Sequence, residues 1–286
     1  MGSFGYADDL TLIAPSSEAT RRMLRCCEAF AREYDVLFNA SKSLHLFFPK
    51  SQSAATVPNL SLDGVEIPIK NQATLLGSCI GSRNTDANFS KAVSDLTFRT
   101  NILLARFGFC SSTMLTSLFK TYCTSFYGSP LWPLDTNSLT RLNISWKRCL
   151  KRIWKVNTRT HSILLPLISC THPLQHILLC RFAKFCINSM NSPNEITKHL
   201  LSIATQSHSI VGQNIRNLLG SLCLHDFTDI ATTIEKLHSS YSESINIDTI
   251  CVASAIAELC AMRDSKDYSF FDRAELSIFI DSLCIS

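Results

Sequence analysis

Two adjacent carboxylates near the start of the chain are the residues best suited to chemistry. Asp8 and Asp9 follow an aromatic, small-residue run and precede a short apolar run, residues 10–14, that Pro15 ends. Such a run predicts a buried strand, which would place the carboxylates at the tip of a hairpin. Two neighbouring negative charges favour a hard divalent cation such as Mg²⁺, and paired ions of this kind stabilise an in-line phosphoryl displacement. The alternative is an Asp-Asp pair that only closes a turn.

The distribution of charge is the second informative feature. The formal net charge is +4, yet residues 136–194 carry nine Lys and Arg and no Asp or Glu. Residues 1–135 carry twelve basic and eleven acidic side chains, and residues 195–286 carry six and twelve. A long block without acids indicates a surface for polyanions, most simply a nucleic-acid backbone.

The basic block contains a predicted amphipathic helix at about residues 138–156. Apolar residues repeat at helical spacing on one face: Leu142, Trp146, Cys149, Leu150 and Ile153. Basic residues lie largely away from that face, with Lys147 at its edge: Arg141, Arg148, Lys151, Arg152 and Lys155. A basic face backed by a packed apolar face can follow a phosphate backbone, although plain solvation is the alternative. Trp154 could stack on a base, but we expect it to pack.

Composition limits the class of protein. Apolar residues make up 46% of the 286 residues, which is typical of a globular chain. Seven of the nine glycines lie at or before Gly128, which predicts strands and turns first and long helices later. The apolar runs are too short to span a bilayer, and no basic segment marks a secretory signal. Scattered cysteines among apolar neighbours indicate a reducing compartment, so we expect an intracellular protein, nuclear or cytoplasmic, and no membrane partner.

Local signals predict the elements that position these residues. Ser16 and Glu18 predict the start of a helix that runs to about Tyr34, and a strand is expected over residues 44–48. Asp-Gly at residues 63–64 predicts a type I′ hairpin. Ser111 or Ser112 is expected to cap a helix that follows one ending near Gly108 and that runs to about residue 126. Gly77 marks either a close backbone approach to a nucleic-acid strand or a tight bend, and Lys42 is either a phosphate contact or a surface lysine.

Four short segments in order resemble a known family. Tyr6-Ala7-Asp8-Asp9 followed by an apolar strand resembles the signature of reverse transcriptases, and the flanking sequence is similar to the non-LTR (LINE-type) retrotransposon branch. Residues 39–43 are similar to the Asn-x-x-Lys-Ser/Thr segment of that family, and residues 75–80 resemble its Leu-Gly primer-grip strand. Residues 127–132 resemble the Tyr-Gly-x-x-x-Trp segment of its thumb. The resemblance covers about residues 1–220.

The resemblance implies an α+β fold in three regions. Residues 1–85 would form a partial palm of β-hairpins packed on a helix, residues 86–160 a helical thumb, and residues 161–286 a C-terminal helical region. It implies RNA-directed DNA polymerase activity, with Asp8 and Asp9 as catalytic ligands of Mg²⁺. Expected substrate contacts are Tyr6, Lys42 and Gly77. Expected contacts to the primer-template duplex are Lys147, Arg148, Lys151, Arg152 and Lys155.

The sequence also departs from the family pattern. The family has a further catalytic Asp and a Pro-Gln-Gly segment upstream of the hairpin, and here only five residues precede Tyr6. We therefore expect a truncated polymerase that is inactive alone and that binds deoxynucleotide only if another polypeptide supplies the missing half. Alternatives are a non-catalytic nucleic-acid-binding fragment or a non-functional relic of an element. Residues 221–286 show no site chemistry.

Overall fold

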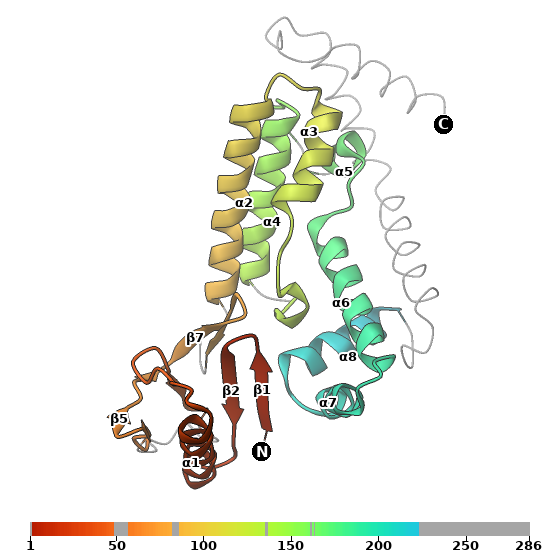
Figure 1. Cartoon of the computed structure of the whole chain (residues 1–286). Coiled ribbons are helices and arrows are strands. Elements are labelled where there is room, and N and C mark those ends of the chain that lie inside the picture. The colour runs from red at the N-terminus through yellow and green to blue at the C-terminus, as the bar shows by residue number, and fades with distance from the viewer. Residues whose placement is uncertain are drawn as a thin grey trace, which may run out of the picture. The chain divides into compact units, whose positions relative to one another are not determined.

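A computed structural model describes residues 2–48, 57–81, 86–134, 137–160, 162 and 164–222 (Figure 1). By its internal contacts the chain divides into two compact units, Met1–Thr85 and Asp86–Ser286, and each is described by itself. The first unit combines short strands with one long helix, whereas the described part of the second is helical, so the chain is α+β. None of the helices in the described ranges is both long and apolar enough to cross a bilayer. The tail from residue 223 onward lies outside the described residues.

The chain begins with a two-stranded hairpin. β1 (Gly2–Tyr6) pairs antiparallel with β2 (Asp9–Ile13), and the register runs from Gly2 opposite Ile13 to Tyr6 opposite Asp9. Ala7 and Asp8 form the turn, as the sequence predicts. The prediction that this strand is buried is wrong, because Leu10 is 44% and Ile13 57% exposed. In the described residues the sheet has only these two strands, so no neighbouring strand covers them.

The helix α1 (Ser17–Tyr34) has the limits that the sequence predicts. The Ser16 hydroxyl accepts a hydrogen bond from the Ala19 N–H at 3.2 Å and so satisfies one free donor of the first turn. The helix ends where Asp35 takes a left-handed conformation, with φ of 53°. Its buried face joins a small core cluster with residues of the following loops and strands: Leu24, Ala40, Leu60, Leu62 and Ile67.

The remaining strands of this unit are short and pair two by two. β3 (His45–Leu46) pairs parallel with β6 (Ile69–Lys70). The strand predicted over residues 44–48 is therefore shorter than expected and as long as β6, with which it pairs. β4 (Ser61–Leu62) and β5 (Val65–Glu66) are joined by Asp63 and Gly64, both with positive φ, and the predicted type I′ turn is confirmed. β7 (Gln72–Leu75) and β8 (Ser78–Gly81) complete the unit.

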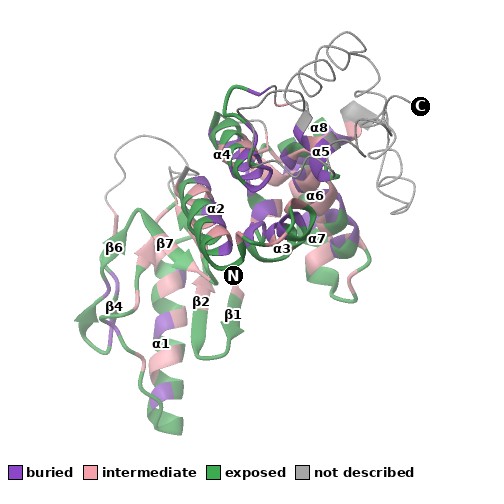
Figure 2. Ribbon diagram, turned by 90° about the horizontal axis from the view of Figure 1, so that it is seen from above, coloured by how far each residue is buried: buried purple, intermediate pink, exposed green. Residues whose placement is uncertain are grey.

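The second unit begins with three packed helical segments. α2 (Asp86–Phe107) lies beside α4 (Asn137–Ile153), and α3 (Ser112–Leu118) packs against both (Figure 1). Figure 2 shows buried residues along one side of α2 and α4. As predicted, Ser111 caps α3, its hydroxyl accepting from the Met114 N–H at 3.3 Å. The helix predicted to reach residue 126 ends earlier, because α3 passes into a π-helical turn, η1 (Phe119–Cys123).

The chain then turns and forms a second helical layer. The 3₁₀ turn η2 (Ser129–Leu131) precedes α4, and α5 (Leu164–Ser169), α6 (Leu174–Met190), α7 (Glu195–Gln206) and α8 (Ile210–Leu222) follow it. One core cluster extends from Phe89 to Leu178, so the packing does not divide at residue 160, where the sequence analysis begins a third region. A second cluster joins α6, α7 and α8, and there burial raises the pKa of Cys186 to about 12.

The buried face of α4 is expected to carry much of the stability of the second unit. Leu142 is fully buried, so Leu142→Ala should lower the free energy of unfolding by about 2–5 kcal/mol. The matched control is Ile144→Ala on the same helix, where the side chain is 45% exposed and the loss should stay below ~1 kcal/mol. The chain contains three tryptophans, Trp132, Trp146 and Trp154, all in this unit, so urea unfolding followed by their fluorescence reports on it selectively. Equal losses for the two variants would contradict this packing.

Candidate functional site

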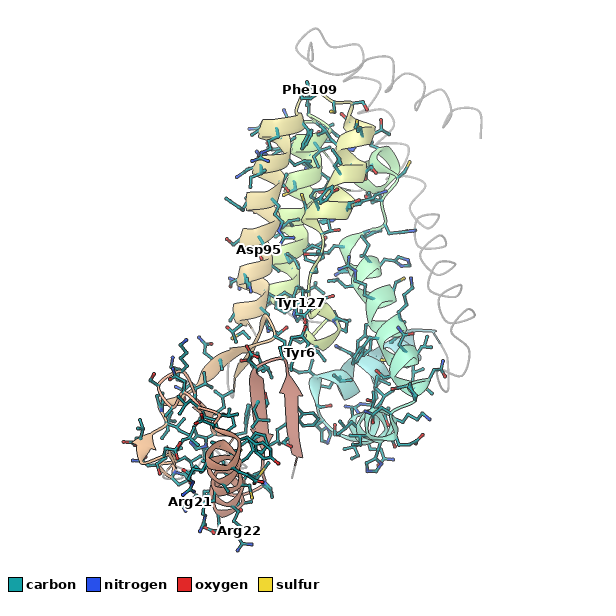
Figure 3. The ribbon with its side chains drawn as sticks, viewed as in Figure 1. Tyr6, Arg21, Arg22, Asp95, Phe109 and Tyr127 are labelled. Carbon is teal, nitrogen blue, oxygen red and sulfur yellow. The ribbon has the colours of Figure 1, made fainter. Side chains whose placement is uncertain are left out.

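The hairpin tip exposes the two carboxylates. Asp8 lies in the turn, Asp9 opens β2 opposite Tyr6, and all three side chains are exposed. Tyr6, which Figure 3 labels, is 66% exposed. Ala7 takes a left-handed conformation, with φ of 49°, as a two-residue hairpin turn requires. Oxygen donors of this kind suit Mg²⁺, which is commonly held by one or two carboxylates, water and substrate phosphates. Among the described residues, no group of three or more His, Cys, Asp or Glu could hold a metal ion.

The two other predicted substrate contacts lie in separate turns of the first unit. Lys42 is exposed in a turn that Asn39 builds, since the Asn39 Oδ1 accepts from the Lys42 N–H at 3.1 Å and from the Ser41 hydroxyl at 2.7 Å. The Asn-x-x-Lys-Ser segment thus has a local structural reason, because the Asn39 side chain caps the turn that contains Lys42. Gly77 follows Leu76 in the β7–β8 turn, and both have positive φ. The backbone makes a tight bend at Gly77, and the close approach to a nucleic-acid strand stays a prediction.

A straight row of arginines lies on the exposed face of α4. Arg141, Arg148 and Arg152 are exposed, and their spacing of seven and four residues puts them within about 40° of one another around the helix. The row spans roughly 16 Å along the axis. Lys147 is half-buried at its edge, and Lys155 is exposed just after the helix, where its φ is 51°. We call Arg141, Arg148 and Arg152 the α4 row.

Lys151 does not belong to the exposed basic face. Its side chain is buried, and its Nζ donates to the carbonyl oxygens of Thr158 and Thr160 in the loop after α4. The prediction that Lys151 contacts nucleic acid is therefore wrong for this conformation, because the ammonium already serves main-chain acceptors. A buried ammonium needs such partners, and here it closes the loop onto the helix.

Neighbouring contacts hold the end of α4 in place. Trp154 packs, as expected, with its Nε1 donating to the Thr116 hydroxyl at 3.0 Å. The Arg152 guanidinium donates to Asn101 Oδ1 of α2 at 2.7 Å, a contact between residues 51 positions apart that local sequence patterns do not predict. This hydrogen bond fixes one member of the α4 row while leaving its outer face exposed.

Acidic side chains do not neutralise the α4 row within the described residues. In the described part of the second unit the ion pair within 4.0 Å joins Lys198 to Glu195, at 2.7 Å. On α1, by contrast, Arg21, Arg22 and Arg25 all lie within 3.8 Å of Glu18. The α1 arginines thus share a carboxylate, which agrees with a solvated face, whereas the α4 arginines present uncompensated charge.

A groove that the sequence analysis did not foresee lies between the segment 125–130 and α6. Its volume is about 520 Å³, and its lining includes Tyr127, Arg181, Lys184 and Phe185. Arg181 donates to the carbonyl oxygens of Ser125 at 2.7 Å and Thr124 at 2.8 Å, and burial lowers its pKa. The alternation of basic and aromatic residues at 181–185 was the available signal, but the partner segment lies more than 50 residues earlier in the chain.

Comparison with known proteins adds no relative. No protein-family model, no curated protein and no solved structure matches this chain. The structure by itself therefore defines an α+β chain with an exposed carboxylate hairpin in one unit and an uncompensated arginine row in the other.

Substitutions of Lys151 and Arg148 should differ in their effect on the free energy of unfolding, because only Lys151 is buried. Lys151→Gln removes the donor to two main-chain carbonyls and is expected to lower the free energy of unfolding of the second unit by about 1–3 kcal/mol. Arg148→Gln removes one positive charge from an exposed site and should change it by no more than ~0.5 kcal/mol. Urea unfolding monitored by tryptophan fluorescence measures both. A stable Lys151→Gln variant would show that the ammonium does not hold the loop.

Proposed function

We propose that this chain is a palm and thumb segment of an RNA-directed DNA polymerase of the non-LTR retrotransposon type. The observation that carries the proposal is the turn at Ala7 and Asp8, in which the Tyr-Ala-Asp-Asp sequence forms a hairpin tip with both carboxylates exposed. A catalytic carboxylate pair must reach a metal ion and a substrate, and a buried or helical Asp-Asp pair would not. The first unit takes the role of a partial palm, and the helices after residue 86 that of a thumb.

In the proposed reaction a primer 3′-hydroxyl attacks the α-phosphate of a deoxynucleotide. A new O–P bond forms, the bond from the α-phosphorus to the α–β bridging oxygen breaks, pyrophosphate leaves, and the hydroxyl proton passes to water. Mg²⁺, when bound, neutralises the charge that develops on the phosphate oxygens. Asp8 and Asp9 supply carboxylate oxygens at the hairpin tip, and Tyr6, Lys42 and Gly77 are the proposed substrate contacts. The carboxylates are too few for a two-ion site among the described residues, so we expect the chain alone to bind without catalysing extension.

The α4 row is the proposed contact to the primer-template duplex. Its span of roughly 16 Å corresponds to about five phosphates of one strand at ~3.4 Å of helix axis each. Lys147 and Lys155 add charge at the edge and at the end of the row. Arginine side chains bind phosphate oxygens through forked N–H groups, and a rigid helix backed by a core holds them in line.

A second candidate is a non-catalytic nucleic-acid-binding protein. It is favoured by the incomplete donor set at the hairpin, which contrasts with a fully formed basic row. Both candidates require the α4 row to bind duplex, and they differ only in what the hairpin does.

Duplex binding should depend on the α4 row rather than on total charge. Arg148→Gln combined with Arg152→Gln is expected to weaken binding to an RNA–DNA duplex and to reduce the slope of log K against log salt by about 2, since each phosphate contact contributes ~0.9. The control pair Arg21→Gln and Arg22→Gln removes the same charge from exposed α1, and should leave the slope nearly unchanged (Figure 3). Fluorescence anisotropy over a salt series measures both. An equal effect of the two pairs would reject a localised site.

Primer extension on an RNA template distinguishes the two candidates. The chain alone, with Mg²⁺ and deoxynucleotides, is expected to give no extension, and duplex binding should persist in EDTA and in Asp8→Asn, because the carboxylates do not contact the duplex backbone. Extension that Asp8→Asn abolishes would instead show that the hairpin completes a catalytic site. Absence of duplex binding even at low salt would reject both candidates.

A further inference from the structure

The groove beside α6 is lined by chemistry that the α4 row does not use. One helical face of α6 forms a wall, with Arg181, Lys184 and Asn188 at i, i+3 and i+7. The segment 125–130 forms the other wall, where Tyr127 is 68% exposed (Figure 3). The lining carries two cations, aromatic rings and several hydroxyl groups, and no acidic side chain.

The two cations of the groove have different tasks. The Arg181 guanidinium donates to the carbonyl oxygens of Thr124 and Ser125 and lies over the Phe126 ring, with 5.7 Å between the guanidinium carbon and the ring centroid. It thereby joins the two walls. Lys184, one turn further along α6, is exposed and is the cation available to an anionic ligand.

The size and polarity of the groove select among occupants. A volume of about 520 Å³ is typical of a site for one small-molecule-sized group and excludes a duplex. An exposed tyrosine offers a face on which a base can stack, and every base has such a face. The positive lining suits an acidic peptide better than an apolar one. Neither peptide, however, would use both the exposed aromatic ring and the cation beside it. An unpaired nucleotide uses both.

We propose that this groove binds an unpaired nucleotide of a single-stranded nucleic acid, with the base stacked on Tyr127 and the phosphate at Lys184. The inference rests on the proposed function in that the chain binds nucleic acid, and it adds a second, single-strand site to the duplex site on α4. Ser129 also lines the groove, but its hydroxyl is buried and so is not counted among the groups that contact the nucleotide.

The experiment uses the full chain and a fluorescent oligothymidylate of about 12 nucleotides, within the range of known single-strand sites. Tyr127→Ala is expected to weaken binding about tenfold, as loss of one base–aromatic stack does. Lys184→Gln should reduce the salt slope by about 0.7, the value for one phosphate contact on a single strand. Controls are Tyr122→Ala, an exposed tyrosine outside the groove lining, and Lys70→Gln in the first unit.

A second measurement does not depend on substitution. An oligonucleotide that carries 5-iodouracil should cross-link, on irradiation, to the peptide that contains Tyr127. Oligothymidylate binding that is absent, or unchanged in both groove variants, would overturn the inference, as would cross-links confined to peptides that do not line the groove. A blunt RNA–DNA duplex serves as the separate probe of the proposed function. Loss of duplex binding alone would contradict the role of the α4 row and not that of the groove. Loss of oligonucleotide binding alone would contradict the role of the groove and not that of the α4 row.

Discussion

The packing of α4 against α2 and α3 is the constraint that places the α4 row at the surface. Leu142, Trp146 and Leu150 are fully or almost fully buried, and a helix that buries these positions must direct the opposite positions to solvent. The exposure of the α4 row therefore follows from the burial of the opposite face of the helix. Contacts at the end of the helix, from Arg152 to Asn101 and from the Ser112 hydroxyl to the Ile153 carbonyl, then fix its rotation against both neighbours.

The first unit is specified differently, by turns more than by a core. Its core cluster is small, and its sheets have two strands each, a size that is marginal without further packing. Local chemistry compensates: a hydroxyl cap at Ser16, a turn capped by the Asn39 side chain and left-handed residues in the hairpin turns. Apolar side chains such as Ile13 stay exposed on the hairpin. A surface of this kind suits a partner strand or layer, and the palm proposal would supply one.

Residue type and spacing within a short segment predicted most of the helix caps, turns and buried helix faces. The cap of α1, the type I′ turn at Asp63 and the buried face of α4 follow from residue type and spacing within a few positions. Lys151 could not be predicted, because its acceptors lie in a loop whose path no helical period determines. The exposure of β2 depends on how many strands join the sheet, and the groove depends on residues such as Arg181 and Thr124 that are 57 positions apart. Each failure concerns a contact outside the regular helix or hairpin to which the residue belongs.

Uncompensated charge on α4 affects the stability of the second unit. Like charges about 6 Å apart on one helix face, as at Arg148 and Arg152, repel each other, and no described acid relieves them. The buried face must offset this repulsion, which falls as salt screens it. A polyanion that binds only the folded row relieves the same repulsion and stabilises the fold by mass action. On α1, where Glu18 lies beside the arginines, this repulsion is already relieved within the free protein, so a bound polyanion would stabilise the α4 row more than the α1 face.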